Sequence, residues 1–249
     1  MPGGLTELVV ASREHLTPGM VRVRFTGADP ADFAEAFGAS AFTDRYVKLV
    51  FPQADGGSVV RTYTALDPDV AAATLAIDFV VHGTEGIAGP WAAGAEPGER
   101  IMVRGPGGAY APDAAADWHL LACDEAGLPA VRAALAALPP DAHGYAVVQV
   151  PADAHRQPLA GPVGVTVSWV VDPDPGALAD AVRALSWLPG RVHAFVHGEA
   201  ETVMHGIRPY LLRERAVPRG DVSISGYWRR GRTEEGFREW KRDLAAAEG

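Results

Sequence analysis

The sequence predicts a two-domain β plus α/β protein. An antiparallel six-stranded β-barrel is expected over residues 1–112, followed by a parallel-sheet α/β domain over residues 113–249 that ends in a helix. Up to about residue 110, apolar residues recur at a spacing of two, in short runs broken by Gly, Pro and Asp, which indicates strands. Beyond that point, strand-like runs alternate with helical ones, which indicates a parallel sheet. A length of 249 residues accommodates both domains.

Six apolar runs predict the strands of the first domain. They read LTELVVAS, MVRVRFTG, RYVKLVFP, VVRTYTAL, TLAIDFVVHG and RIMVRGP, and DPADFAEAFGAS predicts a helix among them. Antiparallel strands of this number with one buried face form a small barrel or a sandwich, and we expect the barrel.

The second domain is predicted from five strands and four helices. The strands read WHLLAC, YAVVQV, GVTVSWVV, RVHAFVHG and VSISGYW, and the helices are expected over residues 128–138, 176–185, 201–215 and 234–246. Strands joined by right-handed helical crossovers form a parallel sheet with helices on both faces.

Composition excludes several classes of function. The 22 Lys and Arg against 31 Asp and Glu give a net charge of −9, which argues against a general nucleic-acid or anionic-membrane binder. No apolar run approaches the roughly 20 residues of a membrane-spanning helix, so no integral membrane contact is expected. The single cysteine, Cys123, and a start without a signal-peptide pattern favour a cytoplasmic location.

The stretch RTYT is the first candidate site. Alternate residues of a strand share a face, so Arg61 and Tyr63 are expected side by side. The guanidinium suits a phosphate and the aromatic ring suits a flat ring system, while Thr64 could reach ring heteroatoms. The alternative is an exposed arginine beside a core tyrosine.

A glycine-rich loop forms the second candidate. It follows the strand that ends at His82 and enters a short helix at GPWAAG, where backbone N–H groups near Ala88 and Gly89 could receive a pyrophosphate. The alternatives are a plain turn, a structural histidine at 82 and a core aromatic at Trp91.

The third candidate lies where the strands of the second domain end. Asp124 and Glu125 occupy the first strand-to-helix turn, where the G-x-G-x-x-G fingerprint of dinucleotide sites is missing, and their alternative role is helix capping. Further residues are expected at the carboxyl edge of the sheet, where α/β proteins bind ligands. These are Gly198, Glu199, Tyr227 and Trp228.

These segments, taken in order along the chain, resemble the siderophore-interacting protein family of flavin-dependent ferric-siderophore reductases, within the ferredoxin-reductase-like group. The segments that carry the resemblance are YVKLVFP, RTYT, DFVVHG with GIAGPWA, GPGG, DEAGLPA, HGEA with IRPYLL, and SGYWRRG. The resemblance implies that FAD binds the barrel and that a nicotinamide nucleotide binds the second domain. It assigns FAD contacts to Arg61, Tyr63, Thr64, Asp78, Val80, His82, Ala88, Gly89 and Trp91. Asp124, Glu125, Gly198, Glu199, Tyr227 and Trp228 would then surround the nucleotide or cover the flavin. The family commonly has Ser or Thr where this chain has Gly89, so its phosphate contact is expected from the backbone.

The resemblance also implies the reaction. NADPH or NADH would reduce FAD, and the flavin would pass electrons to the Fe(III) of a ferric siderophore, releasing iron as Fe(II). A ferredoxin is the alternative donor. Because many ferric siderophores are anionic, we expect a basic docking site. Its candidate residues are Arg45, Lys48, Arg229, Arg230 and Arg232. The alternative is that these residues are ordinary surface charges. The alternatives are another flavin reductase or ferredoxin-linked oxidoreductase on the same scaffold, and a siderophore-binding protein without enzymatic activity.

Overall fold

The computed structural model describes residues 4–83, 86–231 and 236, and the chain divides into two compact units. The barrel unit comprises Met1–Pro112, Pro129–Leu138 and Ala154–Ala160. The α/β unit comprises Asp113–Leu128, Pro139–Asp153 and Gly161–Gly249. The first unit therefore includes two short segments from the second half of the sequence.

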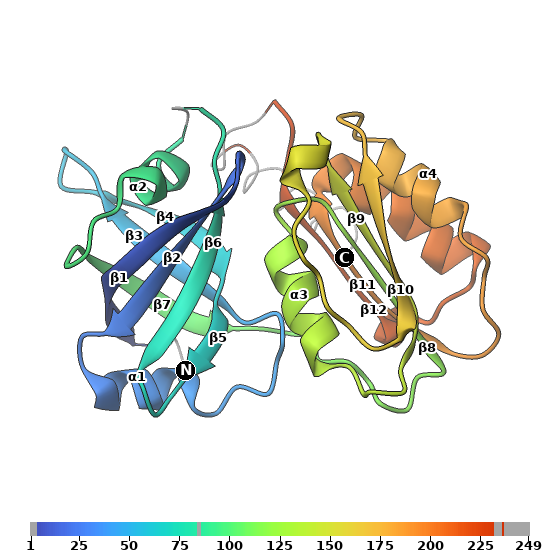
Figure 1. Ribbon diagram of the computed structural model, residues 1–249, viewed down its shortest axis with the longest axis horizontal. Helices are drawn as coiled ribbons and strands as arrows, with labels where there is room; N and C mark the ends of the chain where they lie inside the picture. The colour runs from blue at the N-terminus through green and yellow to red at the C-terminus, as the bar shows by residue number, and fades with distance from the viewer. Residues whose placement is uncertain (1–3, 84–85, 232–235, 237–249) are drawn as a thin grey trace. The chain divides into compact units, whose positions relative to one another are not determined.

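In the barrel unit, the described residues form a seven-stranded antiparallel sheet in the order β4-β3-β7-β1-β2-β6-β5 (Figure 1). The strands are β1 (Leu5–Thr17), β2 (Met20–Gly27), β3 (Tyr46–Pro52), β4 (Ser58–Thr64), β5 (Leu66–Asp69), β6 (Thr74–Val80) and β7 (Arg100–Gly107). Two helices accompany them, α1 (Pro30–Phe37) and α2 (Ala88–Gly94).

The two edge strands explain why this sheet curls. Strands β4 and β5 lie at opposite edges of the sheet, yet only Ala65 separates them in the sequence. The sheet must therefore bring its edges together, and the rings of Tyr63 on β4 and Phe79 on β6 lie 4.5 Å apart. The curled antiparallel sheet confirms the predicted fold class. The predicted count of six strands is wrong, because the run VVRTYTAL divides at Ala65 where the chain crosses from one edge to the other.

The inner face of the curled sheet is apolar. On β2, Val21, Val23 and Phe25 are buried in the core, whereas Arg22 and Arg24 alternate with them on the other face. Helix α1 adds Phe33 and Phe37, and α2 adds Ala88 and Ala92. Alternating polarity in the sequence thus produces one packed face per strand.

The α/β unit contains a five-stranded parallel sheet in the order β10-β9-β8-β11-β12. Its strands are β8 (Trp118–Cys123), β9 (His143–Val150), β10 (Gly164–Val171), β11 (Val192–Glu199) and β12 (Val222–Trp228). Helix α3 (Leu128–Ala137) follows β8, and α4 (Ala177–Arg183) follows β10 (Figure 1). Short helical turns occur at η1 (Asp153–His155) and η4 (Arg219–Asp221).

The five predicted strands and the first two predicted helices of this unit are confirmed, with small shifts at their ends. The predicted helix over residues 201–215 is also confirmed, as a continuous helical stretch over residues 200–214. It is π-helical in η2 (Glu201–Ile207) and η3 (Tyr210–Glu214) and α-helical between them. The helix predicted over residues 234–246 lies outside the described residues. None of the described helices has the length and hydropathy needed to cross a bilayer.

Candidate functional site

The edge strand β4 presents Arg61 and Tyr63 on one face. Both side chains are half-buried, whereas Thr62 between them is exposed. The Tyr63 ring packs against Phe79 with an interplanar angle of 42°, and Nη1 of Arg61 donates a hydrogen bond to the carbonyl of Val60 at 3.1 Å. A cation beside an aromatic ring is therefore present on this strand, as the two-residue spacing predicts.

The Trp91 side chain of α2 lies among core aromatics. Its ring is 5.6 Å from that of Phe51, 5.8 Å from that of Phe79 and 6.3 Å from that of Phe25. The interpretation of Trp91 as a core aromatic is therefore correct for its packing.

Gly89, at the start of the same helix, lies close to β6. A Cβ atom there would be 3.1 Å from the carbonyl oxygen of Val80. This close approach favours glycine over residues that carry a Cβ atom at this position.

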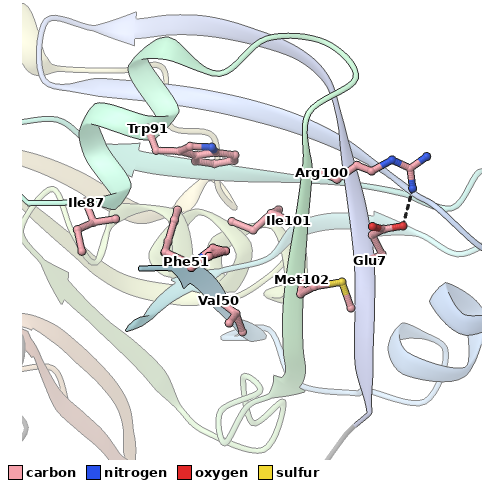
Figure 2. Close-up of a pocket in the computed structure, with 9 residues that line it drawn as sticks. Glu7, Val50, Phe51, Ile87, Trp91, Arg100, Ile101 and Met102 are labelled. Carbon is pink, nitrogen blue, oxygen red and sulfur yellow. Dashed lines mark hydrogen bonds and ion pairs between the residues drawn. The ribbon is translucent and has the colours of Figure 1, made fainter. Parts of the chain in front are cut away.

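A pocket of about 380 Å³ lies between α2, β3 and β7 (Figure 2). Arg100 and Glu7 form an ion pair at one side of it, with Nη1 and Oε2 2.5 Å apart. Of its lining residues, sequence reasoning named Trp91 as a cofactor candidate and missed the others, most of which lie on strands and resemble ordinary strand positions. The lining residues are Glu7, Val50, Phe51, Pro52, Ile87, Trp91, Arg100, Ile101 and Met102.

Asp78 and Val80 project from the other face of β6. They alternate with Phe79, which lies in the core with Tyr63. The Asp78 carboxylate accepts hydrogen bonds from Nε of Arg22 at 2.6 Å and from Nη2 at 2.8 Å. These bonds raise the pKa of the Arg22 guanidinium. Sequence reasoning also missed Arg22, although alternation along β2 places it on the same face.

The remaining predicted FAD residues of the barrel unit differ in exposure. Thr64 is buried at the end of β4, Ala88 is buried in the core, and His82 is exposed beyond the end of β6. The structure thus brings Arg61 and Tyr63 together, whereas Asp78 lies on the opposite face of the sheet and is engaged by Arg22.

The basic candidates occupy separate places. Lys48 is exposed and pairs with Thr62 across β3 and β4, so it lies on the face opposite Tyr63. Arg45 is half-buried just before β3. Arg229 forms an ion pair with Glu201, with Nη2 and Oε2 2.9 Å apart. Arg230 is exposed, and Nη2 donates to the carbonyl of Pro173 at 3.3 Å, while Arg232 lies outside the described residues.

In the α/β unit, Asp124 joins three elements at the carboxyl edge of the sheet. Its Oδ1 accepts hydrogen bonds from the backbone N–H of Ala126 at 2.9 Å and of Gly127 at 3.2 Å. Its Oδ2 accepts bonds from the backbone N–H of Glu199 at 2.8 Å and from Nε1 of Trp228 at 2.6 Å. Burial raises the pKa of the Asp124 carboxyl, and these four hydrogen bonds oppose the rise.

Glu199 is likewise engaged within the chain. Its Oε2 accepts a hydrogen bond from the backbone N–H of Thr202 at 2.9 Å, and its Oε1 accepts one from the backbone N–H of Arg230 at 3.1 Å. Glu125 beside Asp124 is 8% exposed, and the Tyr227 ring meets the ring of His197 at 4.9 Å. Asp124 thus caps the turn of residues 125–127 that leads into α3, which is close to the helix-capping role considered for it.

The order of the parallel sheet and the curled antiparallel sheet together define a class of protein. The structure is similar to the ferredoxin reductase of carbazole 1,9a-dioxygenase, with a TM-score of 0.72 and 18% identity over 92% of this chain and 70% of that one. The fold is therefore ferredoxin-reductase-like.

Sequence comparison defines the family. Residues 55–110 match the family model of the siderophore-interacting FAD-binding domain, and residues 116–231 match that of the siderophore-interacting protein. A siderophore utilization protein from T. fusca has a similar structure, with a TM-score of 0.80 and 35% identity over 94% of this chain and 95% of that one. The chain belongs to the siderophore-interacting protein family.

Three relatives are similar over most of their length. An uncharacterized protein of Mycobacterium tuberculosis strain H37Rv is 48% identical, over 96% of this chain and 95% of the relative. The ferric vibriobactin reductase ViuB of Vibrio cholerae is 30% identical, over 91% and 90%. The NADPH-dependent ferric-chelate reductase of Escherichia coli K12 is 29% identical, over 89% and 92%.

Proposed function

We propose that this protein is an FAD-dependent ferric-siderophore reductase that takes electrons from NADPH or NADH and releases iron as Fe(II). The observation that carries the proposal is the pairing of Arg61 with Tyr63 on one face of β4, within residues that match an FAD-binding domain. The names of two relatives, a ferric vibriobactin reductase and a ferric-chelate reductase, support the substrate class.

Bound FAD would accept a hydride from the nicotinamide donor and pass electrons singly to chelated Fe(III). In this proposal Arg61 binds the phosphates of FAD, because a guanidinium donates paired hydrogen bonds to such oxygens. The half-buried Tyr63 ring packs on the flavin, with Phe79 fixing its tilt. His82, Ala88 and the backbone of Gly89 complete the cofactor contacts from residues 1–112.

The fit of these residues to FAD rests on the exposure of β4 and the small residues of α2. A half-buried ring on an edge strand offers surface for stacking, which a fully buried tyrosine would not. Because Gly89 has no side chain, any hydrogen bond from this position to a phosphate of FAD would come from its backbone N–H. Asp78 supports β6 through Arg22 in this proposal, and any contact with the flavin would be indirect.

An anionic ferric siderophore would be received by positive charge. Of the described candidates, Lys48 in the barrel unit and Arg230 in the α/β unit have exposed side chains and Arg45 is half-buried, and each is a proposed docking residue, whereas Glu201 offsets the charge of Arg229. The cytoplasmic location and the boundary between residues 112 and 113 stay predictions.

The decisive experiment starts with purification. The purified protein is expected to show the absorption spectrum of oxidised flavin. Under anaerobic conditions, NADPH or NADH should bleach this absorption by reducing the flavin, and a ferric siderophore should restore it by reoxidising the flavin. The double substitution of Arg61→Ala and Tyr63→Ala should lower FAD retention without changing the far-ultraviolet circular dichroism spectrum. Arg24→Ala, an exposed arginine on β2, is the matched control and should retain FAD. A colourless wild-type protein that binds ferric siderophore without reducing it would contradict the proposal.

A further inference from the structure

The parallel sheet has a switch point between β8 and β11. The chain builds outward from β8 through β9 to β10, then returns to the other side of β8 for β11 and β12. In open α/β sheets, ligands bind in the crevice outside the carboxyl ends of the strands at such a point, and the first turn receives the phosphates through free backbone N–H groups.

In this protein, the Asp124 carboxylate already occupies the backbone N–H groups of the turn after β8. Oδ1 of Asp124 accepts the N–H groups of Ala126 and Gly127, and Oδ2 accepts that of Glu199 from the adjacent strand. A carboxylate with both oxygens engaged is electrostatically similar to a bound phosphate. A nucleotide phosphate entering this turn would have to displace Asp124 and would meet its negative charge.

The space around the carboxylate is also filled. A Cβ atom on Gly198 would lie 2.9 Å from the Asp124 carboxyl group. A Cβ atom on Gly127 would lie 2.6 Å from both the carbonyl oxygen of His197 and Cβ of Cys123. The glycines at this turn therefore make room for the protein's own Asp124 carboxylate and for the close approach of the turn to β8 and β11.

Trp228 covers the same place from β12. It pairs with Glu199 at the end of β11, and its Nε1–H donates to Oδ2 of Asp124, the residue directly after β8, one strand further away. The indole therefore reaches across the carboxyl end of β11. Because its single polar hydrogen is bonded to Asp124, the ring is held in one orientation with 37% of the residue exposed.

We propose that the switch-point crevice is closed by the chain itself: Asp124 fills the phosphate position and fixes Trp228 across the end of β11, so the nicotinamide donor binds without entering the β8–α3 turn. Asp124 is thus a positioning residue that sets how the donor is recognised. This inference rests on the proposed function, since it concerns the donor of that reaction.

The first test uses the flavin-loaded wild-type protein and NADP⁺ as the probe, followed by amide and indole N–H resonances. We expect NADP⁺ to shift other amides, while the resonances of Ala126, Gly127, Glu199 and the Trp228 indole stay unchanged. Saturable shifts at the three turn amides would overturn the proposal. This experiment measures NADP⁺ binding and no turnover. If the protein does not reduce a ferric siderophore, the proposed function is wrong, but the position at which NADP⁺ binds is still decided by these resonances.

The second test opens the turn. Asp124→Ser keeps a helix-capping side chain but removes the charge, and we expect its Kd for NADP⁺ to fall about fivefold as the turn amides become accessible. Asp117→Asn is the matched control. This carboxylate accepts the backbone N–H of Arg191 at 2.6 Å at the opposite end of β8, and its loss should leave the Kd unchanged.

Equal or weaker NADP⁺ binding by Asp124→Ser would overturn the proposal, because it would mean that the carboxylate does not exclude the nucleotide. If that variant does not fold, Asp124→Asn replaces it. The amide –NH2 of Asn must face either the two N–H groups now bonded to Oδ1, of Ala126 and Gly127, or the two now bonded to Oδ2, of Glu199 and the Trp228 indole. At least one of these pairs of resonances should therefore move, and its exchange with solvent should quicken. Four unchanged resonances would show that the carboxylate does not hold this turn and ring, and would overturn the proposal.

Discussion

Replacing Asp78 separates a structural carboxylate from a cofactor ligand. The Asp78 side chain is 1% exposed and that of its partner Arg22 is 13% exposed, and two hydrogen bonds of 2.6 and 2.8 Å join them. Removing one member of a buried ion pair leaves the other charge uncompensated, which costs about 3–5 kcal/mol. We therefore expect Asp78→Ala to lower the free energy of unfolding by about this amount, through β2 and β6.

Urea unfolding provides the assay. With a slope of about 2–3 kcal/mol per molar urea, the midpoint should fall by about 1–2.5 M. Amide hydrogen exchange should locate the loss on β2 and β6. A double variant, Arg22→Met with Asp78→Leu, removes both charges and should recover most of the stability, because a well-packed apolar pair often equals a buried ion pair. If Asp78→Ala unfolds like the wild type but loses FAD, the structural interpretation is refuted.

Three further predictions concern other positions. Gly89→Ser should retain FAD about tenfold more tightly than Gly89→Ala, since both introduce the same Cβ contact and only serine adds a hydroxyl donor; equal dissociation constants would exclude that contact. Burial lowers the pKa of His119 and of His193, so as the pH falls these histidines bind protons in the unfolded chain before they do so in the folded protein. The melting temperature should therefore fall as the pH drops below about 6.5, and it should fall less steeply in the His119→Phe variant. Gly144→Ala places Cβ 1.9 Å from the carbonyl oxygen of His119 and should destabilise the fold by at least about 1–3 kcal/mol, whereas Gly220→Ala, with open space around it, should be neutral in the same melting assay.

Periodicity predicted most of the fold, because each strand buries one face or both. Alternation along MVRVRFTG and the continuous apolar run WHLLAC both became strands with the expected burial. The division at Ala65 was not predictable in this way. The segment that follows it, LDPD, reads as a turn because it contains Pro68 and two aspartates, and only the pairing of β5 with β6 shows that it forms a strand at the other edge.

The candidate site was predictable where its geometry is local. Arg61 and Tyr63 share a face because they are two residues apart on a strand, which the sequence states directly. Asp78 and Arg22 are 56 residues apart, and the register of β2 with β6 decides their contact. The partners of Asp124 on β11 and β12 are 75 and 104 residues away. A single sequence does not encode such pairings in any spacing.

The missing glycine fingerprint gains a physical meaning from these contacts. A dinucleotide turn needs a glycine so that the pyrophosphate can approach the backbone, and at this turn the chain instead has Asp124. The glycine that remains, Gly127, allows the turn to approach Cys123 of β8 and the carbonyl of His197 on β11 closely. The fold thus keeps the switch point of a nucleotide-binding sheet, while one side chain decides whether a phosphate enters it. Sheet order alone therefore predicts where a donor could bind, and the hydrogen-bond partners of the turn predict whether it binds there.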